Sequence, residues 1–392
     1  MTSAVNRFLV GMILLCFPVI VANATDESIW LDVKINGQPV RFAFDTGAGG
    51  LLITRDAADR LGLKIINAPH AYQPPPGLVD IGWTEKCRVT LWNKTIKTRL
   101  IVGGIPKGAD LDCDGLVGWP SVTKRIFSID AATQSVKFLD RVPEEAAAWT
   151  KLRVQANSDL LNLEIPMPDG KTAIISLDTG RPSGVDLNPQ ERREWELAHT
   201  NQPTTMSGFY FACAGIVTAE ETWAHKIALG PLELMEVPVE MIHATKPAYR
   251  FLWPSGAMAT LGLAAMNQLD IIIDGKHSMA YLRPKKTPPL PYEHNRLGAA
   301  FVPRDSQNDD LVAHVADGSP AYEAGIRNGD VLSQIDGRDV TNWRTSKQPN
   351  SPFRDKPAGT KLELTLKRGD KVFKTTAVLR NILPPDPPKH LN

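Results

Sequence analysis

Val40-Arg41-Phe42-Ala43-Phe44-Asp45-Thr46-Gly47 is an apolar run that ends in Asp-Thr-Gly, and the tripeptide recurs at Asp178-Thr179-Gly180 after a second apolar run. Each run is the return half of a hairpin pattern. The first follows residues 29–35 and Asn36-Gly37, and the second follows residues 161–165 and Asp169-Gly170. An alternating segment, an Asn-Gly or Asp-Gly turn and a return segment predict a β-hairpin. The sequence therefore predicts the same hairpin twice, each leading to an aspartate.

Two later landmarks are repeated in the same order. Asp114-Gly115-Leu116-Val117-Gly118 is echoed by Thr260-Leu261-Gly262-Leu263, and Ile129-Asp130 is echoed by Ile273-Asp274. Each Ile-Asp pair leads into a further apolar segment, and the spacing between copies is kept to within a loop insertion. A repeat on this scale defines the architecture, so we expect two homologous halves.

With these motifs the chain resembles the aspartic proteases, in which each lobe supplies an Asp-Thr-Gly loop and a later hydrophobic-hydrophobic-Gly segment. Leu116-Val117-Gly118 fits the second element, whereas Thr260 replaces one apolar residue ahead of Leu261-Gly262. The short lobes and Ala48 are similar to retropepsins, and the duplication within one chain is similar to pepsin-like enzymes. The resemblance covers roughly two thirds of the chain. It implies a mainly β fold, with two homologous β-barrel lobes forming a single-chain pseudo-dimer.

The resemblance implies that Asp45 and Asp178 are the catalytic pair of a peptide hydrolase. Two carboxylates a few ångströms apart cannot both ionise, so they share one proton and hold a water. One carboxyl group then acts as base toward the water, and the other acts as acid toward the scissile carbonyl. The alternative is that Asp-Thr-Gly is only a strand-to-turn sequence, which would not require the matched glycine segments downstream.

The residues that follow each aspartate are expected to support the pair. Glycine after the threonine allows a sharp turn and presents backbone N–H groups to the carboxylate. By resemblance, the two threonines hydrogen-bond across the lobe interface and hold the two loops in register. The supporting residues are Thr46, Gly47, Thr179 and Gly180.

Arg181 follows the second motif, where the resemblance leads us to expect a small or hydroxyl residue. If its guanidinium reached the pair, it would favour the ionised carboxylate and lower the apparent pKa values of both groups. We expect instead that the side chain points into solvent.

Composition and charge indicate a multi-domain globular protein. The 392 residues exceed what one core usually supports, and 43% hydrophobic with 22% charged residues is ordinary globular usage. A formal net charge of +1 argues against nucleic acid or an anionic membrane as the main partner.

The N-terminus has the pattern of a secretory signal peptide. Arg7 precedes the apolar run Phe8 to Val21, and Ala22-Asn23-Ala24 is a small-residue cleavage site, so we expect cleavage before Thr25. The run is short for a membrane span, and no later segment qualifies. The sequence therefore predicts a periplasmic or secreted protein without an integral membrane segment.

Three cysteines remain after the signal peptide: Cys87, Cys113 and Cys213. At most one intramolecular bridge can form, and we favour Cys87 with Cys113 because both lie in the first lobe, while the other pairings stay open. The His and Cys spacings do not suggest a metal site, and no cofactor is expected.

Each lobe should carry a flap, a hairpin that closes over substrate. The candidates are Tyr72-Gln73-Pro74-Pro75-Pro76-Gly77 through Trp83 and Ser207-Gly208-Phe209-Tyr210-Phe211, although these aromatics could equally pack into the lobes.

Glu144 to Ala148 is expected to form a short helix between the lobes. The expected organisation is a signal peptide (1–24), a first lobe (25–140), a linker (141–157), a second lobe (158–284), a Pro/Lys-rich linker (285–293), a third domain (294–382) and a tail (383–392).

The last of these domains is predicted from Asp317 to Leu332, which contains Gly-Ser-Pro-Ala-Tyr-Glu-Ala-Gly-Ile and Asn-Gly-Asp, and from the Asp336-Gly337 turn. This stretch closely resembles the PDZ domains of bacterial envelope proteases. Ser319-Pro320 should begin a short helix, and residues 361–367 and 372–379 should form closing strands. The alternative is a small β-rich cap without a ligand.

PDZ domains of this type bind a peptide's C-terminal carboxylate in a backbone loop, and the peptide then adds a strand to a sheet edge. The matching segment is Leu297-Gly298-Ala299-Ala300-Phe301. Gly298 would allow the close approach of the backbone, and Leu297 and Phe301 would line an apolar pocket or belong to the core.

Together these features predict an aspartic endopeptidase that acts on peptide or protein substrates and whose PDZ domain binds C-terminal tails. The rival hypothesis is an envelope peptide-binding or scaffolding protein that kept the protease fold and lost turnover. Retention of Asp45 and Asp178 favours the enzyme.

Overall fold

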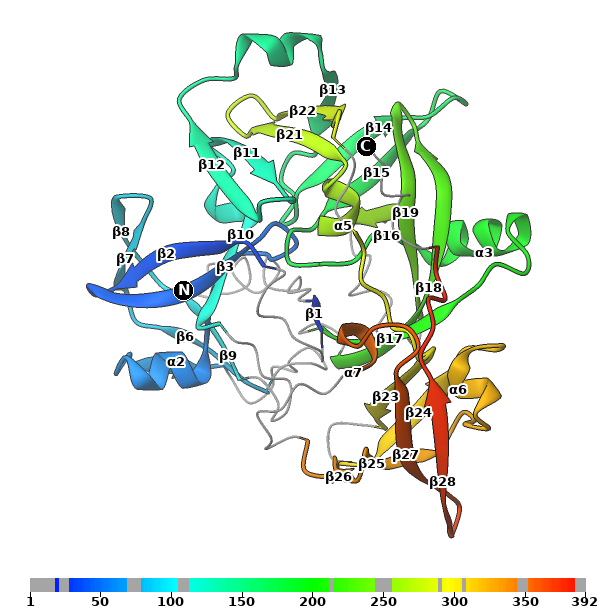
Figure 1. The fold of residues 1–392 in the computed structure, drawn as a ribbon. Coiled ribbons are helices and arrows are strands. Elements are labelled where there is room, and N and C mark those ends of the chain that lie inside the picture. The colour runs from blue at the N-terminus through cyan, green and yellow to red at the C-terminus, as the bar shows by residue number, and fades with distance from the viewer. Residues whose placement is uncertain are drawn as a thin grey trace.

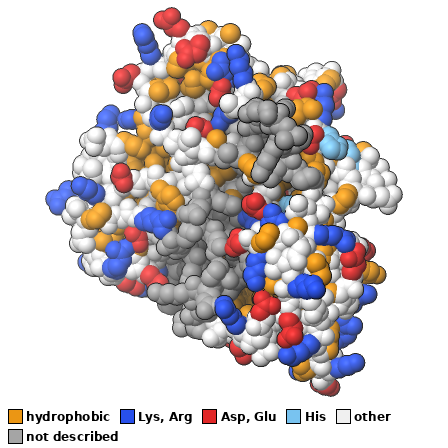
Figure 2. Space-filling view, viewed as in Figure 1, with side chains coloured by type: hydrophobic (Ala, Val, Ile, Leu, Met, Phe, Trp, Pro, Cys, Tyr) orange, Lys and Arg blue, Asp and Glu red, His pale blue; other side chains and the backbone are white. Residues whose placement is uncertain are grey.

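The computed structural model describes residues 18–20, 28–68, 79–104, 113–211, 215–243, 256–287, 291–304, 308–343 and 352–384. The protein is mainly β, as the sequence predicts, with three sheets and a few short helices (Figure 1). On the face shown in Figure 2, Lys and Arg side chains are intermixed with Asp and Glu side chains, in keeping with the small net charge.

The first sheet is built around the first Asp-Thr-Gly hairpin. β2 (Trp30–Ile35) and β3 (Gln38–Asp45) pair antiparallel across the Asn36-Gly37 turn, where both residues have positive φ. Inward-facing residues of β2 alternate with exposed ones, which is why this segment is a strand with one buried face. The strands of this sheet, in spatial order, are β5 (Ile65–Asn67), β6 (Val79–Thr84), β9 (Ile101–Gly104), β4 (Leu51–Thr54), β10 (Gly115–Gly118), β3 (Gln38–Asp45), β2 (Trp30–Ile35), β7 (Cys87–Leu91) and β8 (Lys94–Thr98), with helix α2 (Arg55–Arg60) after β4.

The second sheet is built around the second hairpin, formed by β14 and β15. It continues past that hairpin to two strands from the first half of the chain. Its strands, in spatial order, are β1 (Pro18–Ile20), β17 (Thr205–Phe211), β18 (Gly215–Leu229), β19 (Leu232–His243), β16 (Val185–Leu187), β20 (Ala259–Leu261), β15 (Thr172–Leu177), β14 (Asn162–Pro166), β13 (Thr150–Val154), β22 (Met279–Pro284), β21 (Leu269–Asp274), β11 (Ile126–Asp130) and β12 (Ser135–Leu139), with helices α3 (Pro189–Ala198) and α5 (Leu263–Met266).

The two sheets repeat one order of strands. β3 pairs parallel with β10, β10 antiparallel with β4, and β4 parallel with β9. In the second sheet β15 pairs parallel with β20, β20 antiparallel with β16, and β16 parallel with β19. The next strands, β6 and β18, are antiparallel in both cases. The duplication seen in the motifs therefore extends to the topology of each lobe.

The lobes differ from the expected architecture in two respects. Neither sheet closes on itself among the described strands, so the lobes are open sheets and not barrels. In addition, residues 141–157 are not only a linker: Glu144–Ala148 forms a short 3-10 helix, and β13 pairs with β14 and β22. Backbone groups in this segment satisfy their hydrogen bonds within the sheet, which a free linker would leave to water.

A shared sheet and a shared core join the lobes. β11, from the first half of the sequence, pairs with β21 from the second half, from Ile126–Asp274 to Ile129–Ile271. The fully buried Phe44 of β3 packs its ring edge-on against Phe127 of β11, with ring centroids 5.7 Å apart. Burial of such rings stabilises this junction.

The C-terminal domain has the elements that its sequence predicts. Ser319 caps helix α6 (Pro320–Glu323), and the Asp336-Gly337 turn has positive φ at both residues. The long closing hairpin is formed by β27 (Lys361–Arg368) and β28 (Lys371–Val378). β23 lies at one edge of this sheet. The elements are β23 (Ala299–Pro303), β24 (Leu311–Val315), α6 (Pro320–Glu323), β25 (Val331–Ile335), β26 (Arg338–Asp339), α7 (Pro352–Asp355), β27 (Lys361–Arg368) and β28 (Lys371–Val378).

The favoured disulfide is absent. Cys87 is a buried free thiol, so the expected bridge to Cys113 is wrong, and Cys213 lies outside the described residues. The Cys87 sulfur instead lies 3.7 Å from the carbonyl oxygen of Thr98, inside the β7–β8 hairpin. None of the helices in the described part of the chain is long and apolar enough to span a membrane.

Candidate active site

Asp45 and Asp178 both lie at the ends of buried strands. Asp45 is the last residue of β3 and pairs with Gly118 of β10. Asp178 follows β15, and its backbone N–H donates to the carbonyl of Leu261 in β20. Both side chains are almost fully buried. The equivalent strands of the two lobes therefore present the two carboxyl groups in equivalent ways.

Each aspartate is held by its own loop and lies against the other loop. The N–H of Gly47 donates to Asp45 Oδ1 at 2.8 Å, and the N–H of Gly180 donates to Asp178 Oδ1 at 3.0 Å. A Cβ atom on Gly47 would lie 2.4 Å from Cγ of Asp178, and one on Gly180 would lie 2.5 Å from Cγ of Asp45. Any side chain at either glycine would therefore collide with the carboxyl group of the opposite lobe.

Thr46 and Thr179 bind each other through reciprocal hydrogen bonds. The backbone N–H of each donates to the hydroxyl oxygen of the other, at 3.0 Å in both directions. The hydroxyl of Thr46 donates to the carbonyl of Leu177, and that of Thr179 donates to the carbonyl of Phe44, both at 2.7 Å. All of these groups are buried, so the bonds fix the relative position of the two loops.

The later glycine segments pack beneath the loops. The N–H of Gly118 donates to the carbonyl of Gly50, and the N–H of Gly262 donates to the carbonyl of Gly184. A Cβ atom at Gly118 would lie 2.2 Å from the carbonyl oxygen of Ala48, and one at Gly262 would lie 2.4 Å from that of Ser183. This close approach explains why both repeats place glycine at this position.

Burial raises the pKa of Asp178 above its ordinary value. The positive charge of Arg181, a hydrogen bond with Asp45 and the N–H groups of Gly180 and Gly47 oppose this rise by stabilising the ionised form. A carboxyl group hydrogen-bonded to a second carboxyl group, in a buried place with amide donors, is the arrangement that shares one proton between two acids.

The expectation that Arg181 points into solvent is wrong. Its side chain is only 4% exposed and forms ion pairs with Asp186 and, at 3.4 Å, with Glu240. Burial acts to lower the pKa of Arg181, but Asp186, Glu240 and Asp178 outweigh it, so the guanidinium stays charged. The sequence could not reveal this, because Glu240 reaches Arg181 only through the pairing of β16 with β19.

Two carboxyl groups share this single guanidinium. Burial raises the pKa of Asp186 to about 6 and that of Glu240 to about 8, against the opposing effect of Arg181. The hydroxyl of Ser183 also donates to Glu240 Oε2 at 2.8 Å. The net charge beside Asp178 therefore depends on the protonation of Asp186 and Glu240.

The same cluster extends toward the C-terminal domain. Glu221 of β18 pairs across the ladder with Glu240 of β19 and is buried. The hydroxyl of Tyr292, in the second predicted linker, donates to Glu221 Oε1 at 2.9 Å. The linker is thus tied to the sheet that carries the second aspartate.

The candidate flap of the second lobe is part of a strand ladder. Residues 207–211 are the last five residues of β17, which pairs with β18, and Phe209 and Tyr210 are buried. β1 pairs antiparallel with the outer edge of this segment, from Pro18–Phe211 to Ile20–Phe209. In the first lobe, residues 72–77 lie outside the described residues, and Trp83 is in β6.

The predicted peptide-binding segment of the C-terminal domain is divided between three roles. Leu297 and Ala299 belong to the core of that domain, so Leu297 does not line an open pocket. Ala300 packs with Met206 of β17. Phe301 is partly buried, with its ring 5.8 Å from that of Phe353.

The N–H groups of the loop itself are engaged by a side chain that the sequence did not single out. Leu297 N–H and Gly298 N–H both donate to Oδ1 of Asn295, at 2.9 and 3.2 Å.

No group of three or more His, Cys, Asp or Glu side chains in the described ranges is placed to bind a metal.

Comparisons with known families agree with this geometry at both ends of the chain. Residues 31–73 match the aspartyl protease family, and residues 295–379 match the PDZ domain family. The first match includes Asp45 and its loop, and the second runs from Asn295 to Leu379, just after β28. The chain matches none of the curated proteins. It therefore carries an aspartyl protease domain near the N-terminus and a C-terminal PDZ domain, which together indicate a protease with a peptide-binding module.

Proposed function

We propose that the protein is an aspartic endopeptidase in which Asp45 and Asp178 activate one water between two lobes of a single-chain pseudo-dimer. The observation that carries this proposal is the reciprocal approach of each glycine to the opposite carboxyl group, at 2.4 and 2.5 Å from a hypothetical Cβ. That approach supports one site formed by two buried acids from the two repeats, because two unrelated turns would not bring each glycine against the carboxyl group of the other.

The mechanism follows from one shared proton. The ionised carboxylate removes a proton from the bound water, which attacks the scissile carbonyl, while the protonated carboxyl group donates to the carbonyl oxygen. Arg181 favours ionisation of Asp178, since its charge opposes the effect of burial. Burial nevertheless keeps the pKa of Asp178 above its ordinary value, so either carboxyl group of the pair can carry the shared proton. The Thr46 and Thr179 hydrogen bonds keep the two groups at the distance that this exchange needs.

Substrate is expected to bind as an extended strand against the β17–β18 hairpin. The outer edge of β17 pairs with β1, an extended segment within the predicted signal peptide. If residues before Thr25 are removed by export to the periplasm or medium, that edge becomes open to an extended peptide. Such a peptide would lie along the candidate flap of the second lobe.

A peptide library tests the proposal. The purified protein, incubated with a proteome-derived peptide digest between pH 3 and 8, should cleave internal bonds, and a statine-type transition-state analogue should suppress cleavage because it mimics the hydrated carbonyl. Cleavage that resists this analogue would contradict the aspartic mechanism. No cleavage at any pH, together with retained binding of the analogue, would favour the rival scaffolding protein.

A further inference from the structure

The PDZ domain packs against the β17–β18 hairpin of the second lobe. Ala300 of β23 forms a small apolar cluster with Met206 of β17 and Ala316. A Cβ atom on Gly208 would lie 2.8 Å from Cγ1 of Val302, so β17 approaches β23 closely there. The candidate flap of the second lobe is therefore supported by the strand that would bind a PDZ ligand.

Asn295 joins the two elements. Its Oδ1 accepts from the N–H groups of Leu297 and Gly298 in the carboxylate loop. Its Nδ2 donates to the carbonyl of Met206 in β17 at 2.8 Å and to that of Ala299 at 2.9 Å. Two donors on one side and two carbonyl acceptors on the other fix the orientation of this buried amide.

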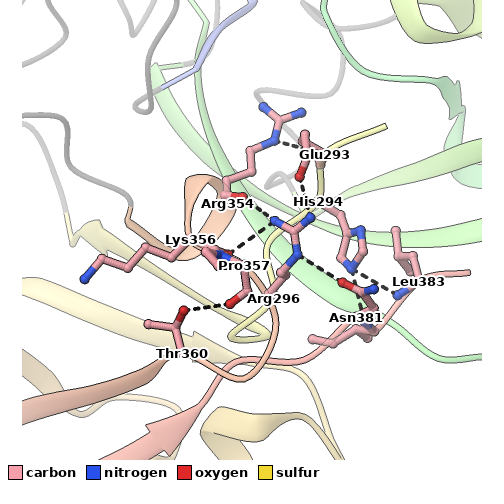
Figure 3. A network of polar contacts seen from close by, with 10 residues as sticks. Glu293, His294, Arg296, Arg354, Lys356, Pro357, Thr360, Asn381 and Leu383 are labelled. Atoms are coloured by element: carbon pink, nitrogen blue, oxygen red, sulfur yellow. Dashed lines mark hydrogen bonds and ion pairs between the residues drawn. The ribbon is translucent and has the colours of Figure 1, made fainter. Parts of the chain in front are cut away.

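The residues on either side of Asn295 are held by the PDZ domain itself (Figure 3). Arg296 binds Glu293, Asn381 and the backbone carbonyl of Arg354 in α7. His294 Nε2 accepts from the N–H groups of Ile382, at 3.0 Å, and Leu383. Because its neighbours are fixed, the Asn295 amide reaches both β17 and the loop without moving the backbone.

We propose that Asn295 is a positioning residue that occupies the carboxylate loop of the PDZ domain and ties it to the flap hairpin, so that a peptide C-terminus must displace it. The loop has two N–H groups directed at one amide oxygen, which is the arrangement that a terminal carboxylate would use more strongly. Displacing the amide also releases the hydrogen bond to Met206. Peptide binding at the PDZ domain therefore loosens β17.

This inference rests on the proposed function only for its consequence in catalysis, and its test needs no turnover. The full chain carrying Asp45→Asn is titrated with a fluorescent decapeptide that ends in Val-Ala, as the free acid and as the C-terminal amide. Asn295→Ala removes the competing acceptor, so the free acid should bind about tenfold more tightly, which corresponds to about one hydrogen bond. The amidated peptide should bind both proteins equally.

Asn295→Asp is the matched variant, because it keeps the acceptor in the loop and loses the donor to Met206. It should bind the free acid at least about tenfold more weakly than Asn295, since a charged acceptor already occupies the N–H groups. In hydrogen exchange, both Asn295 variants without peptide should show faster exchange in residues 205–211 and unchanged exchange in β27. The Asp45→Asn chain that retains Asn295 should show the same change when the free acid is added. Equal binding of the free acid by Asn295 and Asn295→Ala would overturn the displacement. Unchanged exchange in residues 205–211 on peptide addition would overturn the coupling. Both measurements test the inference even if the protein cleaves no peptide.

Discussion

The hydroxyl oxygen of Thr46 lies 3.0 Å from the backbone nitrogen of Thr179, and the reciprocal pair of atoms is separated by the same distance. These bonds join residues of the two repeats beneath the candidate catalytic pair. Thr46→Val would leave a buried amide and a buried carbonyl without partners, so the free energy of unfolding should fall by about 1–3 kcal/mol. Urea unfolding measures the change.

The control for this substitution is Thr95→Val. Its hydroxyl also pairs with a threonine, Thr90, at 2.8 Å, but on an exposed hairpin. Its effect should stay within about 0.5 kcal/mol. Equal effects of the two substitutions would mean that the hydrogen bonds between the lobes contribute no more than a surface pair.

Replacing Arg181 should affect both stability and the pH dependence of hydrolysis. Arg181→Met leaves the ionised carboxylate of Asp186 buried without its cation, which should cost about 3–5 kcal/mol at neutral pH. Asp178 also loses a favourable charge, so its pKa rises and the acidic limb of the pH–rate profile should move to higher pH. A triple variant that adds Asp186→Asn and Glu240→Gln to Arg181→Met should recover stability. Its pH–rate profile should still keep the acidic limb at the higher pH. If the acidic limb of the pH–rate profile stays at the same pH in both variants, Arg181 does not affect the ionisation of Asp45 and Asp178.

Glu240 should make the protein less stable as pH rises. Its pKa is raised from 4.5 in the unfolded chain to about 8 in the folded protein, chiefly by burial. The folded state therefore keeps a proton that the unfolded state releases, so the stabilising contribution is complete below pH 4.5 and is lost as pH rises toward 8. Glu240→Gln should remove this decline. Unfolding free energies at pH 4.5, 6 and 8 test it, and parallel curves for the two proteins would contradict the assignment.

His294 should have the opposite dependence. Burial, with the positive charges of Arg296 and Arg354, lowers its pKa from 6.5 to about 4. The neutral ring accepts two backbone N–H groups at Nε2. The stability that it contributes is complete above pH 6.5 and is lost as pH falls toward 4. His294→Ala should therefore cost about 1–3 kcal/mol at pH 7 and clearly less at pH 4.5. If the cost is the same at both pH values, the stabilisation by His294 does not depend on its neutral ring nitrogen as acceptor of the two backbone N–H groups.

The sequence predicts best what is encoded locally. Asn36-Gly37 and Asp336-Gly337 were expected to be hairpin turns, and both adopt positive φ at the central residues. Ser319 was expected to start a helix and caps α6. These elements depend on turn and cap chemistry between residues close in the chain.

Features that depend on pairing between distant strands were missed. Arg181 was expected in solvent because its partners Asp186 and Glu240 meet only in the folded β16–β19 ladder. Asn295 was not singled out, since its roles are set by backbone groups of Met206 and Gly298. The β13 segment was taken as part of a linker, and its partners β14 and β22 lie on either side of it in the sheet.

The most direct test of the account is peptide hydrolysis by Asp45→Asn and Asp178→Asn, assayed separately and as an equimolar mixture, with far-UV circular dichroism to confirm folding. One site built from both repeats predicts that each variant loses at least about 10³-fold in kcat/KM, and that mixing restores nothing, because each chain still carries one damaged pair. Activity that persists in Asp178→Asn would contradict the account, since it would place the site between the first lobes of two chains.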